Sequence, residues 1–174
     1  AELLPGSSDH NGGRLAIGPI SENMDYLFYG VGDMGAGHLG NASRAHHGQI
    51  PQIYEGKILR FNLVPDGDAS PEDSWIPNDN PFNIQTNQNA VWSMGHRNPQ
   101  GLYFDITSNI LWENEHGPKG GDEINIIQKG KNYGWPIVTY GREYYGPKIG
   151  TTVQPGIEQP VYYFIPSIAP SGLT

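Results

Sequence analysis

Residues 101–113, which read Gly-Leu-Tyr-Phe-Asp-Ile-Thr-Ser-Asn-Ile-Leu-Trp-Glu, have the pattern of a β-hairpin. Apolar residues gather toward the two ends of the stretch, and Asp105, Ser108 and Asn109 lie between them. Short runs of aromatic and branched residues separated by such a polar cluster are typical of two strands joined by a turn. The stretch therefore predicts strands over residues 101–105 and 110–113.

A second copy of this pattern lies earlier in the chain. Residues 15–17 and 26–29 repeat the two apolar runs at an offset of 84–87 residues, again with a polar turn between them. That offset equals two units of about 43 residues, which lies within the length range of propeller blades. At this pitch the 174 residues are expected to form three to four blades. Propeller blades bring their loops together around a central channel, so distant polar residues can meet there.

The rest of the chain alternates short apolar runs with turns in the same way. Gly (24) and Pro (15) together exceed a fifth of the 174 residues. Each Gly inside a helix costs about 1 kcal/mol and each Pro about 3, which argues against long helices. The chain is predicted to be all-β, a partial β-propeller domain over residues 1–174 that is a fragment of a larger domain. Further strands are expected over residues 14–17, 26–30, 57–63, 90–94, 123–128, 134–139 and 161–164.

The charge balance restricts the classes of partner. Eighteen acidic residues against ten basic ones give a formal charge of −8, which argues against nucleic acid or an anionic membrane surface as a partner. The chain has no Cys, so disulfides and thiol chemistry are excluded. No apolar run approaches the roughly 20 residues of a membrane span, so no span is expected.

One glycine motif suggests an alternative function. Gly30, Gly32 and Gly35 match G-x-G-x-x-G directly after a predicted strand, as in dinucleotide-binding folds. Such a fold needs a helix to begin there, because the helix N-terminus holds the pyrophosphate. Residues 36–41 are broken by glycine and show no helical period. The motif therefore gives a nicotinamide site little support.

Three predicted loops concentrate His, Arg and acidic residues between Gly and Pro. They cover residues 10–15, 95–101 and 115–125. Taken alone, each one is better explained as a turn or a solvated hairpin loop than as a functional site. Polar groups gathered on loops of a rigid scaffold are typical of a functional site, so their joint presence favours one.

At these loops the sequence resembles the PQQ-dependent soluble aldose dehydrogenases, six-bladed β-propellers related to soluble glucose dehydrogenase. The resemblance runs along nearly the whole chain. The motifs that carry it are His10-Asn-Gly-Gly-Arg-Leu15, Gly32-Asp33, Gly56-Lys-Ile-Leu-Arg60, Gly95-His-Arg-Asn-Pro-Gln-Gly101, His116-Gly-Pro118, Asp122-Glu-Ile-Asn125, Asn132-Tyr-Gly-Trp-Pro136 and Pro166-Ser-Ile-Ala-Pro-Ser171.

The resemblance implies an oxidoreductase that converts aldose sugars at C1 to lactones by hydride transfer to PQQ. It implies that His10 is the general base for the anomeric hydroxyl, a task that suits a neutral imidazole. It also implies that Asp33 orients His10, that Arg97 stabilises the reduced quinone, and that Asn98 helps to bind the cofactor.

Calcium is implied in the same way. The backbone carbonyls of Gly117 and Pro118 resemble the ligands of the calcium ion that clamps the quinone, and calcium prefers such oxygen donors. Glu123 and the carbonyl of Tyr133 resemble a second, structural calcium site. Two further residues, Tyr162 and Ser167, fall where the family lines its substrate channel.

The resemblance also gives expectations about partners and compartment. An aldose substrate, an external electron acceptor and a periplasmic or secreted location in a bacterium are implied. An arc of blades leaves edges exposed, so a homodimer that closes a ring is a further possibility. The alternative from a different class is a non-catalytic β-propeller binding module that binds no quinone. The presence of His10, Arg97 and the Gly117–Pro118 turn favours the enzyme.

Overall fold

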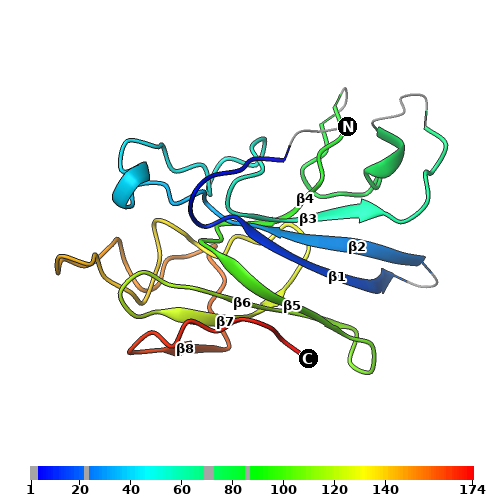
Figure 1. Cartoon of the computed structure of the whole chain (residues 1–174). Helices are drawn as coiled ribbons and strands as arrows, with labels where there is room; N and C mark the ends of the chain where they lie inside the picture. Colours follow the sequence, from blue (N-terminus) through cyan, green and yellow to red (C-terminus); the bar gives the residue numbers. More distant parts are fainter. Residues whose placement is uncertain (1–3, 22–23, 69–72, 85–86) are drawn as a thin grey trace.

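The computed structural model describes residues 4–21, 24–68, 73–84 and 87–174, so eleven residues of the predicted domain lie outside the described part. The described strands form two four-stranded antiparallel sheets, in the orders β1-β2-β3-β4 and β5-β6-β7-β8 (Figure 1). The first sheet contains β1 (Gly12–Ser21), β2 (Met24–Val31), β3 (Lys57–Asn62) and β4 (Val91–Met94). The second contains β5 (Pro99–Asp105), β6 (Ile110–Glu115), β7 (Asp122–Ile127) and β8 (Tyr162–Phe164).

Apolar side chains that alternate along the strands hold the two sheets together. One buried cluster takes residues from both sheets, and β1 lies against β5. The approach is close at Gly18, where an added Cβ would lie 2.1 Å from the ring of Phe104. The cluster consists of Tyr26, Phe28, Ile58, Trp92, Leu102, Phe104, Leu111, Ile127 and Tyr133.

The all-β class is confirmed, but the number of blades differs from the expectation. A propeller blade is a four-stranded sheet, and the described residues form two such sheets instead of three to four. The internal sequence repeat explains the difference, because it aligns β1 and β2 with β5 and β6, which are the first two strands of the two sheets. The offset of 84–87 residues is therefore the length of one sheet with its loops. Long connections over residues 32–56, 63–90 and 128–161 take up the remaining chain.

One predicted strand is wrong. Residues 134–139 form a turn, with only an isolated bridge between Val138 and Thr151. The backbone N–H groups of Ile137 and Val138 both donate to the carbonyl of Gly134, at 2.7 and 2.9 Å, so they are not available to a sheet. Gly134 itself has a φ of 100°, which favours glycine and breaks an extended run. The other predicted strands are found, with β1 longer than expected.

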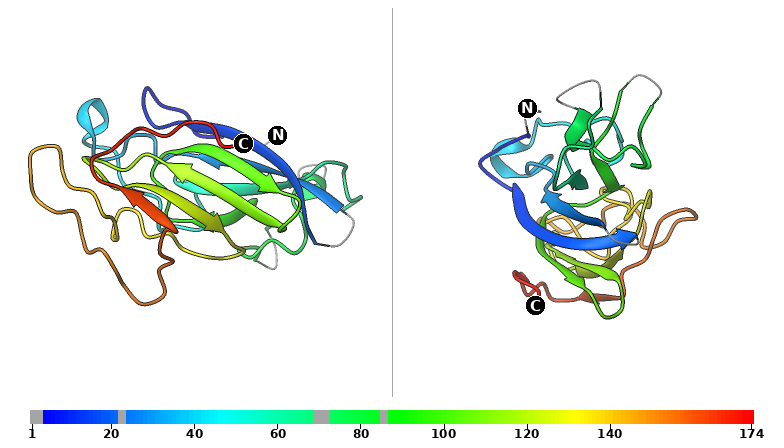
Figure 2. Two further views of the ribbon diagram at one scale, coloured as in Figure 1. Left: turned by 90° about the horizontal axis from the view of Figure 1, so that it is seen from below. Right: turned by 90° about the vertical axis from the view of Figure 1, so that its right-hand side faces the viewer.

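The antiparallel order brings the polar loops to one end of the molecule. The start of β1 pairs with the end of β2, through Gly12 and Val31. The start of β5 likewise pairs with the end of β6, through Pro99 and Glu115. The loops at these strand ends, with the long loop between β7 and β8, lie together on the left in Figure 1, and Figure 2 shows that long loop reaching away from the sheets.

Two short 3₁₀ helices, Leu39–Asn41 and Asp73–Trp75, lie in the connections. The first follows the glycine motif, where a dinucleotide fold needs an α-helix, so the nicotinamide alternative is not supported. In the part of the chain that the structure describes, no helix is long and apolar enough to cross a membrane.

Candidate active site

The site begins with the unusual backbone of His10, directly before β1. Its φ is 48°, a conformation that residues other than glycine rarely adopt and that often marks functional positions. The loop after β2 supports it, since the N–H of Met34 donates to the His10 carbonyl at 3.3 Å. Gly32 makes this approach possible, because an added Cβ there would lie 1.8 Å from the His10 oxygen. The glycines of the motif thus allow close backbone packing.

The side chain of His10 is oriented by Asp33, as expected from the sequence. The Nδ1 of His10 lies 2.7 Å from an oxygen of Asp33, whose side chain is 1% exposed. The same oxygen accepts from the N–H of Gly35 at 2.9 Å, and the other accepts from the indole N–H of Trp135 at 2.7 Å. An ionised carboxylate only accepts hydrogen bonds, so the hydrogen of His10 sits on Nδ1 and Nε2 carries the free lone pair.

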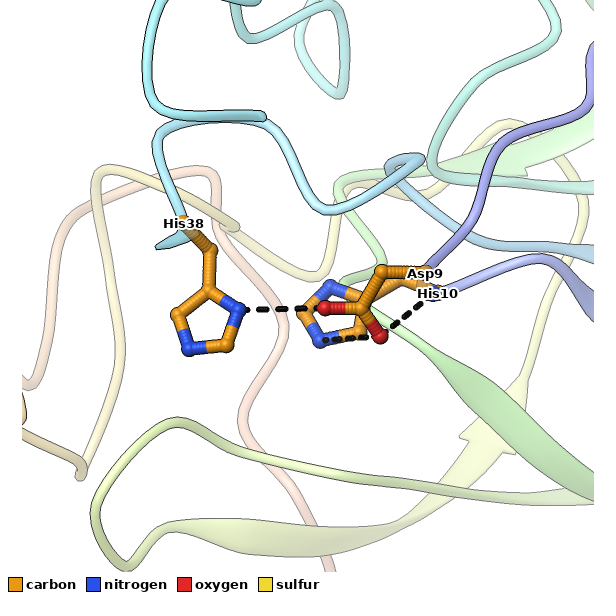
Figure 3. A group of neighbouring side chains, drawn as sticks. All are labelled: Asp9, His10 and His38. Atoms are coloured by element: carbon orange, nitrogen blue, oxygen red, sulfur yellow. Dashed lines mark hydrogen bonds and ion pairs between the residues drawn. The ribbon is translucent and has the colours of Figure 1, made fainter. Parts of the chain in front are cut away.

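A second carboxylate and a second imidazole lie next to His10, and the sequence reasoning missed both. The carboxylate of Asp9 is 3.7 Å from Nε2 of His10 and 3.1 Å from Nδ1 of His38 (Figure 3). The two imidazole rings are nearly parallel, with centroids 5.5 Å apart. Burial alone would raise the pKa of Asp9, but the hydrogen bond from His38 and the electrostatic and backbone interactions with His10 outweigh it and hold that pKa below its usual value.

Arg97 and Asn98, between β4 and β5, lie beside the loop after β2, where the N–H of Asp33 donates to the Arg97 carbonyl at 2.8 Å. Arg97 is 4% exposed, and its Nη1 donates to the carbonyls of His116 and Gly117 at 3.0 and 2.7 Å. Its guanidinium also lies over the ring of Trp135, 5.3 Å from the centroid. The Nε of Arg97 is buried without a hydrogen-bond partner among the described residues, so it remains available as a donor.

Asp122, at the start of β7, fixes the turn that carries Gly117 and Pro118. One oxygen of Asp122 accepts from the N–H of Gly117 at 2.9 Å and from the hydroxyl of Ser167. The other accepts from the N–H groups of Ile168 and Ala169 at 2.7 and 2.8 Å. This carboxylate therefore brings Ser167 beside the turn from a distant part of the chain.

These loops line an open cavity of about 690 Å³. The predicted residues that line it are His10, Arg97, Asn98, Gly117, Pro118 and Ser167. Asp33 lies behind His10 and supports it. Tyr162 is not among the lining residues; it lies half exposed on β8.

Two cations at the cavity were not singled out from the sequence. Lys119 and Arg142 both line it, and their backbones form an isolated antiparallel bridge with hydrogen bonds of 3.1 and 3.2 Å. Lys119 lies within the polar segment 115–125, so the sequence already indicated that it could lie near the site. Arg142 sits in an irregular loop, and no motif indicates that it returns to the site. With Arg97, three positive side chains face or border the cavity.

Three buried glutamates form a separate cluster below the turn. Glu113, Glu115 and Glu123 are all under 9% exposed, and Glu115 pairs with Glu123 across β6 and β7. Burial, followed by the charge of Glu115, raises the pKa of both Glu113 and Glu123 well above the usual value. One oxygen of Glu113 and the Nδ1 of His96 are buried without a hydrogen-bond partner among the described residues.

A small void of about 10 Å³ adjoins this cluster and is lined by Glu115, Glu123 and Tyr133, among others. The void is large enough for one water molecule or ion. Carboxylate oxygens with unmet hydrogen-bonding capacity are the donors that a hard cation prefers. The residues that the sequence predicted for the second calcium site, Glu123 and Tyr133, both line this void, and Arg97 lines it as well.

Fold and site together define a class: part of a β-propeller in which a carboxylate-supported histidine faces a cation-lined cavity. The family model described as Glucose / Sorbosone dehydrogenase matches residues 4–174. The chain belongs to this family.

Curated relatives agree with this assignment. The chain is 42% identical over 171 residues to the aldose sugar dehydrogenase YliI of Escherichia coli (strain K12), covering 96% of the chain and 40% of the relative. It is 41% identical over 147 residues to quinoprotein glucose dehydrogenase B of Acinetobacter calcoaceticus, covering 78% and 27%. The chain thus spans about 40% of the length of the first relative and less of the second.

Solved structures give the same result. The apo form of the soluble aldose sugar dehydrogenase from Escherichia coli superposes with a TM-score of 0.75 at 42% identity, covering 95% of this chain and 43% of that one. The PQQ-bound aldose sugar dehydrogenase from Streptomyces coelicolor superposes with a TM-score of 0.65 at 35% identity, covering 98% and 40%.

Proposed function

We propose that this chain carries the general base and part of the quinone site of a PQQ-dependent aldose dehydrogenase, which oxidises the sugar at C1 to a lactone. The observation that carries the proposal is the His10–Asp33 pair, 2.7 Å apart, with Nε2 of His10 at a cavity that Arg97 also lines. The similarity to relatives named as sugar and quinoprotein dehydrogenases supports the same activity.

In this proposal His10 takes the proton from the anomeric hydroxyl on its free Nε2. The imidazolium that forms is stabilised by the charge of Asp33, whose orientation is fixed by two further donors, Gly35 and Trp135. PQQ, when bound, supplies the acceptor for the hydride that leaves C1.

The cavity has properties that suit PQQ, a planar tricarboxylate. Its volume of about 690 Å³ lies in the range of small-molecule sites. Arg97, Lys119 and Arg142 supply positive charge for carboxylates, and the unpaired Nε of Arg97 supplies a donor. A cation fixed in a water-poor site stabilises negative charge that develops on a bound quinone, which is the role we assign to Arg97. Asn98 lines the same cavity and would hold the cofactor.

Calcium is part of the proposal at two places. The carbonyls of Gly117 and Pro118 would hold an ion beside the quinone. Arg97 already donates to the Gly117 carbonyl at 2.7 Å, and that oxygen has a second lone pair for a metal. Glu123 and the Tyr133 carbonyl would hold the second ion, and the closeness of three buried glutamates, two of which have pKa values raised by burial and by the charge of Glu115, supports a cation there.

The remaining proposals concern the whole protein. We propose that residues 1–174 are part of one larger propeller domain, that Tyr162 and Ser167 border the substrate channel, and that electrons pass to an external acceptor. A homodimer and a periplasmic or secreted location stay predictions. The alternative is a binding module without a quinone. It does not explain the His10–Asp33 pair or the unpaired Nε of Arg97, both of which the enzyme would use.

Residues 1–174 alone are expected to be inactive unless two copies close a ring, so the test uses the chain extended at both ends to the whole propeller. It is a titration with PQQ in calcium-containing buffer, followed by addition of an aldose while the quinone absorption is recorded. We expect stoichiometric binding and loss of the oxidised quinone spectrum when the sugar is added. Arg97→Ala should bind PQQ more weakly, whereas Arg14→Ala, which removes an exposed arginine outside the cavity lining, should bind it as the parent does. Binding without reduction by any aldose would support the binding module instead, and absence of binding would contradict a quinone site in this chain.

A further inference from the structure

The side chains of Asp9, His10 and His38 meet at one side of the cavity and present a ligand set that the sugar reaction does not require. One ligand atom from each lies within 4.8 Å of the other two. The residues come from two loops, one before β1 and one after β2, and Figure 3 shows the Asp9 carboxylate linked by its two oxygens to the two imidazoles. Two imidazole nitrogens and one carboxylate oxygen are ligands of Zn²⁺ and similar transition metals.

The distances fit a metal of that size. Zn²⁺ binds nitrogen and oxygen at about 2.0–2.2 Å, so two ligands of a tetrahedral site lie about 3.4 Å apart. The Asp9 carboxylate is 3.1 Å from Nδ1 of His38 and 3.7 Å from Nε2 of His10, on either side of that value. These two distances involve different oxygens of Asp9, and the ligand atoms of the three residues lie within 4.8 Å of one another, so rotation of the side chains is needed to bring all three onto one ion.

The environment of His10 also matches that of a metal ligand. A ligating histidine almost always donates its other N–H to a carboxylate or carbonyl, which fixes the ring and increases its basicity. Asp33 does this to His10 at 2.7 Å, and Asp33 is itself held by other donors. The Nε2 lone pair is therefore already fixed toward Asp9. On the far side, the ring of Tyr144 packs against His38 at 4.9 Å and limits its movement.

We propose that Asp9, His10 and His38 form a binding site for a divalent transition metal of the Zn²⁺ class, with its fourth position open to the cavity. All three residues line that cavity, so water or a ligand hydroxyl can complete the coordination. An ion at this site occupies the lone pair of His10. The metal and the proposed sugar substrate therefore compete for the same nitrogen, and zinc acts as an inhibitor of the proposed reaction.

The site is distinct in chemistry from the buried glutamate cluster. That cluster has one imidazole, His96 beside Glu113 and Glu115, and otherwise offers carboxylate oxygen, which suits calcium, whereas two imidazoles favour zinc, copper or nickel. Excess calcium therefore fills the oxygen sites and leaves zinc for the imidazoles. This difference allows the two sites to be measured separately.

The experiment is a Zn²⁺ titration of the PQQ-free chain in excess calcium, followed by competition with a coloured chelator. We expect one zinc ion per chain, and a loss of affinity of at least about tenfold in His38→Gln and in Asp9→Asn. His47→Gln is the matched control, because His47 also pairs with a carboxylate, Glu55 at 2.7 Å, but lies outside the cavity lining.

Retained zinc affinity in His38→Gln and Asp9→Asn would overturn the proposal, as would an equal loss in His47→Gln. Circular dichroism of each variant separates lost binding from lost folding. Cobalt(II) gives a second readout, because a four-coordinate site absorbs visible light far more strongly than hydrated cobalt, and this band should be missing in His38→Gln. The titration measures binding alone, so its result is independent of whether the chain oxidises a sugar.

Discussion

Single residues at the ends of strands hold the neighbouring loops, and Lys57 at the start of β3 is one that is fully buried. Its side chain is 0% exposed, and its Nζ donates to the carbonyls of His47, Gly48 and Glu55 at 3.0, 3.0 and 2.7 Å. Burial lowers the pKa of Lys57 to about 7, against the opposing charge of Glu55. The residue therefore combines a structural role with a proton equilibrium that depends on folding.

We predict that Lys57 makes the stability of the fold depend on pH. The unfolded lysine has its ordinary pKa of 10.5, so between about pH 7 and that value the unfolded chain holds a proton that the folded chain lacks. Stability then rises with pH across this window. From pH 7 to 9 the free energy of unfolding of the parent should rise by roughly 1–3 kcal/mol relative to Lys57→Met, measured by urea denaturation. Parallel pH profiles of the two proteins would show that Lys57 titrates normally in the folded state.

At the scale of elements, the two sheets differ in how their loops are fastened. The first sheet holds the His10 loop through close backbone packing at Gly32. The second holds its loops through one carboxylate, Asp122, which accepts from four donors on two segments. The catalytic and cofactor sides of the proposed site are thus positioned by different interactions.

Removal of the Asp122 carboxylate should therefore release the segment 167–169 from β7. In Asp122→Ala the backbone N–H groups of Gly117, Ile168 and Ala169 lose their acceptor. Leaving the buried Gly117 donor unpaired costs about 1–3 kcal/mol, whereas water can reach the exposed residues Ile168 and Ala169. We expect a lower melting temperature and faster amide hydrogen exchange at Ile168 and Ala169. Asp105→Ala in the β5–β6 turn is the control, and it should change the exchange of neither amide. Unchanged exchange in Asp122→Ala would mean that other contacts hold the segment.

At the scale of the whole molecule, the buried glutamates link cation binding to stability. A ligand that binds only the folded state stabilises it, so calcium should raise the melting temperature of the parent. We predict that Glu123→Gln loses most of this increase, and that Glu158→Gln, which alters an exposed pair with Lys131, keeps it. The measurement is thermal unfolding in calcium and in chelator. An equal effect of Glu123→Gln in both buffers would exclude a calcium ion at this position.

Sequence patterns predicted the all-β class and most strands, because apolar alternation and turn residues act locally. They failed where the outcome depends on distant partners. Residues 134–139 have the composition of a strand, but their N–H groups bond within a turn. The repeat length was assigned to two blades, because loop length cannot be separated from blade length without the strand pairing.

In the candidate site, too, the residues within local motifs were predicted and those placed by distant parts of the chain were not. His10, Asp33 and Arg97 lie in recognisable motifs, and the structure brings all three together. Asp9 and His38 stand outside the motif cores, and only the folded loops place them beside His10. Arg142 reaches the cavity through an irregular connection that has no periodic pattern.

The central claim is that His10 is the base of a quinone-dependent sugar oxidation, and the most direct test is the rate at which an aldose reduces PQQ bound to His10→Gln. A positioned base contributes about 10²–10⁴-fold to rate, so we predict a loss of that size with PQQ affinity unchanged. His47→Gln, measured beside it, should reduce at the parent rate. A parent-like rate in His10→Gln would contradict the account.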